Sequence, residues 1–177
     1  VVVTKRTLEE GSTAWAQGGV AAVLAADDSF ERHIADTLSA GAGLCHDVAV
    51  ELCVKEGPAA IRQLLDYGVP LSRNGSGELD LGREGGHTAR RVAHAGDITG
   101  REIERTLLER AAENPNIQLL EWHMGVDLIV LSRFGGPDTC AGAYVLDEKS
   151  GAVRRVLARQ TVIATGGAGK VYLYTSN

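Results

Sequence analysis

The sequence has no excess of positive charge: its 18 lysines and arginines are outnumbered by 23 aspartates and glutamates, which gives a net charge of −5 at pH 7. Proteins that bind nucleic acid present a basic surface to the phosphates, so this composition argues against that class. No run of about 18 apolar residues occurs, and we therefore expect no membrane span. Aromatic residues make up only 5% of the chain, whereas 44% of its residues are apolar and 22 are glycines. That mixture favours an α/β fold with a real core and many tight connections.

Residues that form disulfides or bind metals are also scarce. The three cysteines, Cys45, Cys53 and Cys140, are odd in number, and their spacing fits no zinc-binding pattern. We therefore expect three reduced thiols in a cytoplasmic protein. The five histidines form no H-E-x-x-H pair or similar arrangement, so we expect no metal site.

The sequence contains no G-x-G-x-x-G motif, whose glycines let a backbone turn approach a pyrophosphate. Its first residue is Val1, inside an apolar strand expected over residues 1–5. In a Rossmann-type domain the motif would come immediately before such a strand. We expect a chain that begins inside a larger domain, so the absence of the motif applies to this piece alone.

What the sequence does have is an unusual stretch after this strand, Gly11–Gly19, which reads Gly-Ser-Thr-Ala-Trp-Ala-Gln-Gly-Gly. It carries too little branched apolar bulk for a core segment and too little charge for a solvent loop. Glycines let a ligand approach the backbone closely because no Cβ stands in the way. Free backbone N–H groups there could meet a phosphate or a carbonyl-rich ring. The alternative is a Gly-rich turn that binds nothing, and composition alone leaves both open.

Capping and breaking signals predict several helices. Asp28 and Glu31 have the spacing of a capping box and predict a helix of about ten residues, which glycines at 41 and 43 end. Asp47 can cap a second helix over residues 48–56. Gly57-Pro58 is expected to break it and to restart a third helix, because proline is tolerated in a first helical turn. That third helix is expected to stop at Gly68.

Two further signals follow along the chain. Asn74-Gly75 predicts the tip of an irregular or hairpin segment. The run Thr99-Gly100-Arg101-Glu102 is a capping box and predicts a strong helix to about Ala112. Asn114-Pro115 is expected to stop that helix.

Beyond Pro115 the pattern changes to short apolar runs and period two, which predicts strands over 117–120, 126–131, 141–146, 153–157 and 160–164. The last strand runs directly into Thr165-Gly166-Gly167-Ala168-Gly169. A buried strand that ends in glycines is where open α/β sheets bind ligands. We expect residues 1–4 and 161–164 to lie in one mostly parallel sheet, and the strands between 126 and 157 to form a small antiparallel meander.

Two of these motifs resemble a known family. Gly11–Gly19 resembles the flavin-contacting segment of the succinate dehydrogenase/fumarate reductase flavoprotein superfamily. Ala164–Gly169, followed by Val171-Tyr172, resembles the second flavin-facing strand end of that superfamily. Between them, Arg83-Glu84-Gly85-Gly86-His87 and the run from Arg90 to Glu102 are similar to its L-aspartate oxidase branch. The resemblance covers essentially all 177 residues.

The resemblance implies an α/β fold: one partial, Rossmann-like FAD-binding domain over residues 1–177, with the antiparallel meander at about 117–157. The first phosphate-binding unit and most of the capping and helical C-terminal domains would lie outside it. Members of this branch oxidise L-aspartate to iminoaspartate, with oxygen or fumarate as acceptor, and the product feeds quinolinate synthase in NAD biosynthesis. The catalytic arginine is expected beyond Asn177, so the isolated piece is expected to be inactive.

The resemblance also implies non-covalent FAD. Succinate dehydrogenases carry a flavin-linking histidine at the position of Ser12, and serine cannot form that bond; the alternative role of Ser12 is a helix N-cap. Lys5 is implied near the adenosine, with a solvated strand-end lysine as the alternative. The residues implied to contact FAD are Lys5, Ser12, Thr13, Ala14, Trp15, Ala16, Gln17, Gly18, Gly19, Ala164, Thr165, Gly166 and Gly167.

Glu84 is the candidate substrate-binding residue that this resemblance implies. A dicarboxylate site is rich in cations, and a carboxylate there would repel succinate but pair with the ammonium that distinguishes L-aspartate from succinate. The alternative is a surface glutamate that is ion-paired with Arg83 or Arg90. Positive potential could come from four nearby side chains, most of which we expect to be structural or surface groups: His87, Arg90, Arg91 and His94.

Two other functions stay open. A fumarate reductase or succinate dehydrogenase flavoprotein subunit would use the same flavin with another substrate, and Ser12 and Glu84 argue against it. A non-catalytic nucleotide-binding fragment is the second alternative. A G-x-G-x-x-G upstream and a catalytic arginine downstream in the full reading frame would exclude it.

Overall fold

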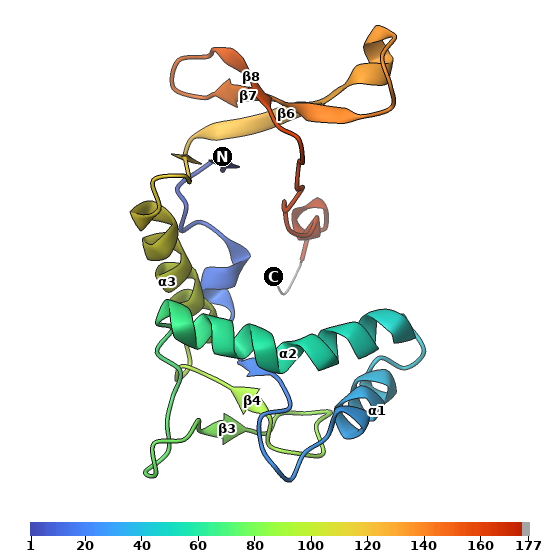
Figure 1. Cartoon of the computed structure of the whole chain (residues 1–177), viewed down its shortest axis with the longest axis vertical. Coiled ribbons are helices and arrows are strands. Elements are labelled where there is room, and N and C mark those ends of the chain that lie inside the picture. Colours follow the sequence, from blue (N-terminus) through green and yellow to red (C-terminus); the bar gives the residue numbers. More distant parts are fainter. Residues whose placement is uncertain (175–177) are drawn as a thin grey trace. The chain divides into compact units, whose positions relative to one another are not determined.

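The computed structural model describes residues 1–174, and the chain divides into two compact units. One unit is the continuous segment Thr13–Arg110. The other combines Val1–Ser12 with the residues from Ala111 onward. Figure 1 labels the helices and strands of both units.

The unit Thr13–Arg110 holds three helices and a small antiparallel sheet with the strand order β2-β4-β3. Its strands are two residues long and pair with Val92 and Ala93 in the centre. Its elements are β2 (Val20–Ala21), α1 (Phe30–Ala40), α2 (Asp47–Tyr67), β3 (Leu81–Gly82), β4 (Val92–Ala93) and the greater part of α3 (Thr99–Glu113).

Helix α1 begins one residue later than the capping-box pattern indicates. Ser29 is its N-cap, and the Ser29 side chain accepts a hydrogen bond from the main-chain N–H of Arg32. The expectation that Asp28 caps the helix is wrong, because both Asp28 oxygens accept hydrogen bonds from Arg91 instead. The expected end at Gly41 is confirmed.

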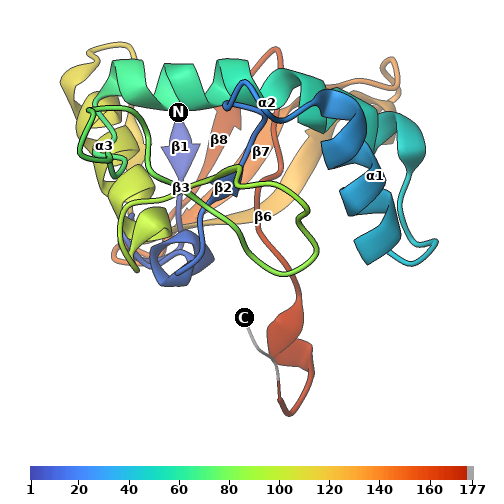
Figure 2. The same ribbon diagram turned by 90° about the horizontal axis from the view of Figure 1, so that it is seen from below.

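Helix α2 is one continuous helix of 21 residues, so the break expected at Gly57-Pro58 is wrong (Figure 2). Val54, Pro58 and Ile61 lie on one face of the helix and are all buried. This burial offsets the main-chain hydrogen bond that proline removes. Asp47 is not the N-cap either, because His46 takes that position and makes no side-chain cap.

The other ends match their sequence signals. Gly68 ends α2 in the left-handed region at φ 98°, which glycine adopts at no steric cost. The turn at Asn74-Gly75 is confirmed, since the Asn74 main chain binds Glu78 and Gly77 across it. Helix α3 begins at Thr99 as expected and ends one residue past Ala112.

The core of this unit lies between α2 and the small sheet. Its buried members come from the residue after β2, from α2, from the segment after α2 and from β4: Ala22, Ile61, Val69, Leu71 and Ala93. Partly buried leucines of α2 and of the segment around β3 extend it. The loop between β3 and β4, which carries Glu84, is called the Glu84 loop. The core therefore holds β2, which follows the Gly-rich stretch, and β4, which follows the Glu84 loop, against α2.

The other unit contains a parallel pair and an antiparallel meander. Strand β1 (Val2–Val3) pairs in parallel with β5 (Leu119–Leu120). The meander has the order β6-β7-β8 and consists of β6 (His123–Val130), β7 (Cys140–Asp147) and β8 (Val153–Leu157). The expected meander is confirmed.

The strand expected over residues 161–164 is not formed, and β1 has β5 as its parallel partner instead. Val162 and Ile163 are 86% and 67% exposed. A strand needs a hydrogen-bonded neighbour and a face to bury, and no described strand pairs with this apolar run.

Among the described residues, no helix is long and apolar enough to cross a membrane.

Candidate functional site

The Gly-rich stretch folds into a short 3-10 turn that is anchored on α3. The turn, Ser12–Trp15, is closed by a hydrogen bond from Ala16 N to Thr13 O of 3.1 Å. Gly100, in the first turn of α3, donates its main-chain N–H to Ala16 O at 3.0 Å. A Cβ on Gly100 would lie 2.7 Å from the Ala16 Cβ and would overlap Thr13 O. Only glycine at position 100 lets helix and turn approach this closely.

The next two residues, Gln17 and Gly18, present main-chain donors at the surface. Gln17 and Gly18 are exposed. Within the part of the chain that the structure describes, their main-chain N–H groups make no hydrogen bond. Trp15 beside them is 83% exposed. The stretch therefore fits a ring with carbonyl acceptors that lies against an unobstructed backbone.

Gly19 has a packing role that the sequence did not suggest. A Cβ there would lie 2.5 Å from Val92 Cγ1 and would overlap Ala93 O. The close approach of the Gly-rich stretch to β4 therefore requires glycine at position 19, whether or not a ligand binds. Gly18 is different, because a Cβ added there would make only ordinary van der Waals contacts.

Those contacts bring together two of the predicted site residues. A Cβ on Gly18 would lie 3.5 Å from Glu84 Oε1 and 3.6 Å from Glu84 Oε2. The Glu84 carboxylate, 66 positions along the chain, therefore lies against the backbone for which the family resemblance implies a flavin contact. A ligand held at Gly18 would be within reach of this carboxylate.

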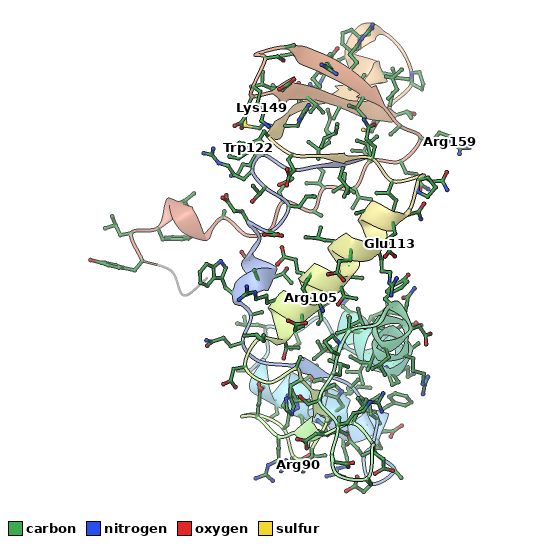
Figure 3. The ribbon with its side chains drawn as sticks, turned by 90° about the vertical axis from the view of Figure 1, so that its left-hand side faces the viewer. Arg90, Arg105, Glu113, Trp122, Lys149 and Arg159 are labelled. Atoms are coloured by element: carbon green, nitrogen blue, oxygen red, sulfur yellow. The ribbon has the colours of Figure 1, made fainter. Side chains whose placement is uncertain are left out.

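Glu84 does not form the ion pair with Arg83 or Arg90 that the alternative interpretation predicts. Among the described residues its carboxylate makes no hydrogen bond or salt bridge, and the side chain is exposed. Arg90 lies at the surface (Figure 3) and donates its Nε to Leu81 O at 2.8 Å. The carboxylate thus keeps its full capacity to accept hydrogen bonds from a cationic ligand.

A buried ion cluster lies under the loop that carries Glu84. The Arg91 side chain is fully buried and binds Asp28 through two hydrogen bonds, Nε to Oδ2 at 2.7 Å and Nη2 to Oδ1 at 2.8 Å. Its Nη1 donates to Asp36 Oδ2 at 2.6 Å and lies 3.3 Å from His87 Nδ1. The same Asp36 oxygen accepts both the main-chain N–H and the hydroxyl of Thr88, at 2.8 and 2.9 Å.

These contacts fix the charges of the cluster. The hydrogen bond from the Thr88 main chain, together with those from Arg91 and the Thr88 hydroxyl, lowers the pKa of Asp36 to about 2. The Arg91 hydrogen bonds lower the pKa of Asp28, and Asp28 in turn raises the pKa of Arg91. The cluster therefore holds two carboxylates and one guanidinium, all ionised, at neutral pH.

His33 of α1 borders the cluster and is uncharged at neutral pH. Burial, reinforced by the nearby charge of Arg91, lowers its pKa. Its ring centroid lies 5.7 Å from that of His87, and its Nδ1 has no hydrogen-bond partner within residues 1–174. A protonated His33 would place a second cation beside Arg91, which the lowered pKa avoids.

The remaining predicted FAD contacts lie in the other unit. Lys5 is exposed just past β1. The neighbouring Arg6 guanidinium lies 5.4 Å from the Trp122 ring centroid, and Lys149 Nζ lies 5.9 Å from it (Figure 3). Residues 161–168 have no regular structure, and the predicted contacts there, Ala164, Thr165, Gly166 and Gly167, are exposed.

Sequence reasoning missed Arg91 and its two aspartates. Arg91 stands in a charged run and was expected to be a structural or surface group or a source of positive potential; its side chain is completely buried, but its partners were not identified. The available signal was the apolar pair Val92-Ala93, which follows Arg91 directly and indicates a buried segment. Capping rules assigned Asp28 to a local role and hid its contact with a residue 63 positions away.

Comparisons with known proteins agree with this arrangement. A family model described as "FAD binding domain" matches residues 1–177. L-aspartate oxidase 1 of Ralstonia nicotianae is 52% identical over 180 residues, which is 100% of this chain and 34% of that protein. The L-aspartate oxidase of Pseudomonas aeruginosa is 50% identical over 99% of this chain and 34% of its own length. The chloroplastic enzyme of Arabidopsis thaliana is 44% identical over 99% of this chain and 27% of its own length.

Solved structures give the same fold. A variant of FrdA from E. coli quinol fumarate reductase superposes with a TM-score of 0.90 at 33% identity, over 97% of this chain and 28% of that one. Mycobacterium smegmatis Sdh1 gives a TM-score of 0.89 at 31% identity, over 99% of this chain and 31% of that one. The chain spans about a third of the length of the bacterial relatives it matches. The resemblance read from the motifs is confirmed, and the chain belongs to the FAD-binding domain family, with FAD as its cofactor.

Proposed function

We propose that this chain forms part of an FAD-dependent enzyme that oxidises L-aspartate to iminoaspartate. The observation that carries the proposal is the Glu84 carboxylate beside Gly18, which has no ion-pair partner in the described part of the chain. It stands next to backbone donors that fit the flavin, where a substrate that exchanges electrons with the flavin must lie. The L-aspartate oxidase names of the relatives support the same substrate.

The chemistry divides between cofactor and chain. Bound FAD supplies the two-electron acceptor for the substrate. Overall, L-aspartate loses two electrons and two protons, one from Cα and one from nitrogen, while oxygen becomes peroxide or fumarate becomes succinate. In this proposal Gln17 and Gly18 offer main-chain donors to the ring, and Glu84 holds the α-ammonium.

The magnitude of such a contact suffices for selection between substrates. Two unit charges about 4 Å apart interact by about 4 kcal/mol at an effective dielectric of about 20. Desolvation reduces this, and a hydrogen bond to a charged group contributes about 1.5–3 kcal/mol net. Succinate has no ammonium and would gain nothing from Glu84, so the carboxylate favours the amino acid over the plain dicarboxylate.

A fumarate reductase or succinate dehydrogenase subunit is the second candidate, because structures of that class share the fold closely. Ser12 stands at the position where such subunits carry the flavin-linking histidine. Serine cannot form that bond, which favours non-covalent FAD. Succinate oxidation without aspartate oxidation by the full-length protein would select this candidate.

The remaining parts of the proposal concern the rest of the cofactor site and the whole protein. We place the catalytic arginine beyond Asn177, and we place the adenosine near Lys5 and the second flavin contact at Ala164–Gly167. Residues 1–177 would then be one part of the FAD-binding domain. The three free cysteines are compatible with a reducing, cytoplasmic location. A consumer of iminoaspartate such as quinolinate synthase would be its functional partner.

The test is Glu84→Gln in the full-length protein that contains this chain. The variant should lose about tenfold to a hundredfold in kcat/KM for L-aspartate, because it loses a charge-assisted contact with the ammonium. Fumarate reduction by the reduced enzyme should persist or improve, since fumarate has no ammonium and a like charge has left its site. Steady-state kinetics with both substrates would measure this.

Glu56→Gln is the matched control, because Glu56 is an exposed carboxylate on α2 without a partner among the described residues. It should leave both activities unchanged. Equal losses for aspartate and fumarate in Glu84→Gln would show that Glu84 supports the structure of the site and does not recognise the amino group.

A further inference from the structure

One residue connects the two segments that build the proposed site. The Arg91 main chain donates its N–H to Gly82 O at 3.0 Å and accepts from Ala22 N at 3.0 Å. Gly82 lies two residues before Glu84, and Ala22 lies four residues after Gly18. The backbone of Arg91 thus fixes the entry to the Glu84 loop beside the exit from the Gly-rich stretch.

The Arg91 side chain fixes the other end of the same loop. Its Nη1 binds Asp36 Oδ2 at 2.6 Å, and that oxygen also takes the two hydrogen bonds from Thr88. The same nitrogen lies 3.3 Å from His87 Nδ1. Arg91 is fully buried and the Asp36 side chain is only 10% exposed, so the contact between these two side chains is shielded from water.

Between these two ends the loop has little structure of its own. A Cβ on Gly85 would meet nothing within 4 Å, and Gly86 has φ 83°. The loop's one internal main-chain hydrogen bond joins His87 N to Glu84 O at 3.2 Å. Two adjacent glycines leave many backbone conformations accessible. The position of the Glu84 carboxylate therefore depends on how firmly the loop ends are held.

We propose that Arg91 and Thr88 are positioning residues for Glu84: through Asp36 they hold the loop so that its carboxylate stays beside Gly18 and meets the amino group of the substrate. This inference rests on the proposed function. It assigns separate roles to the two carboxylates that bind Arg91. The contact with Asp28 joins the residue before β4 to the residues that precede α1, and the contact with Asp36 sets the position of Glu84.

The test uses Thr88→Val in the full-length protein, because valine keeps the shape of threonine and removes only the hydroxyl donor to Asp36. Thr88 is exposed, so the variant should fold and bind FAD normally. KM for L-aspartate should rise about threefold to tenfold while KM for fumarate stays unchanged. Thr88→Ser, which keeps the hydroxyl, should have the same KM for L-aspartate as the parent protein. Thr139→Val, at another exposed threonine, is the control and should change neither value.

Arg91→Lys keeps the charge but loses the planar fork, and we expect a larger rise in the aspartate KM at unchanged FAD content. If it does not fold, Thr88→Val decides alone. The discriminating experiment combines Thr88→Val with Glu84→Gln. A residue that acts through Glu84 adds nothing once Glu84 has lost its charge.

The outcomes separate the two proposals. A loss of aspartate selectivity in Thr88→Val that disappears in the Glu84→Gln background supports the positioning role. An equal change for aspartate and fumarate, or an effect that persists in that background, overturns it. If Glu84→Gln itself leaves aspartate kinetics unchanged, the proposed function fails, and it fails independently of any result at Thr88.

Discussion

Replacement of Gly100 by alanine tests the anchoring of the Gly-rich turn on α3. A Cβ at this position would lie 2.7 Å from the Ala16 Cβ and 3.0 Å from Ala16 O, and it would overlap Thr13 O. Two of these three atoms belong to backbone, so no side-chain rotation can relieve the contact. The turn must move away from the helix, and the hydrogen bond from Gly100 N to Ala16 O must lengthen or break.

Two opposing effects set the size of the change. In an ordinary helix interior, alanine is favoured over glycine by about 1 kcal/mol. Here overpacking costs about 1–3 kcal/mol, and the lost hydrogen bond costs about 1 kcal/mol more. We therefore expect a net loss of about 1–3 kcal/mol in the free energy of unfolding. FAD affinity should fall with it, because Gln17 and Gly18 follow directly after the displaced residue.

The assay is thermal unfolding of the full-length protein at saturating FAD, together with FAD titration by flavin fluorescence. A loss of 1 kcal/mol lowers the melting temperature of a domain of about 150–250 residues by about 2–4 °C. Gly75→Ala is the matched control, since its Cβ meets nothing within 4 Å, and its melting temperature should stay within about a degree. A Gly100→Ala protein that is as stable as the parent would refute the reasoning, because helix propensity would then outweigh the contact.

Two shorter predictions concern charge and cofactor linkage. Because Ser12 cannot form a histidyl link, acid precipitation of the full-length holoprotein should release all of its FAD to the supernatant; flavin retained in the pellet would contradict this. The pKa of Asp36 is lowered from 3.8 to about 2 in the folded protein, so its ionised form favours folding above about pH 4, and this contribution is lost as the pH falls towards 2. Asp36→Asn should therefore destabilise the protein by about 1 kcal/mol more at pH 7 than at pH 3, where part of the contribution is already lost. Denaturant unfolding at both pH values measures this, and an equal loss at the two would contradict it.

Local signals in the sequence predicted the elements that depend on local physics. Gly68 ends α2 with a positive φ that only glycine adopts easily, and Asn74 closes a tight turn with its own side chain. The meander strands alternate with clear turn residues between them. At such places the sequence neighbours supply the decisive hydrogen bonds, so a short window suffices.

The errors arose where distant residues outweigh local rules. Pro58 does not break α2 because its ring is buried on the face that packs against the core. Asp28 leaves its expected cap because Arg91 offers two charge-assisted hydrogen bonds. Neither partner can be identified from a window of ten residues. The same holds for the candidate site. Sequence motifs indicated Gly18 and Glu84, but their closeness in space depends on the tertiary fold and could not be predicted from either motif.

The choice of an ion cluster beneath the Glu84 loop has its own physical logic. Buried ion pairs are often no more stabilising than well-packed apolar residues of equal volume, so stability alone does not explain Arg91. An apolar core could fill the same space, but it could not hold a polar loop in one orientation. The Asp36 oxygen accepts from Arg91, from the Thr88 main chain and from the Thr88 hydroxyl, and only a carboxylate with a fixed negative charge attracts all three donors strongly. Such bonds are directional, and they end four residues from the carboxylate of Glu84. In the proposed function, the cluster holds a glycine-rich loop in one orientation despite its desolvation cost, because discrimination between an amino acid and a plain dicarboxylate requires a precisely placed carboxylate.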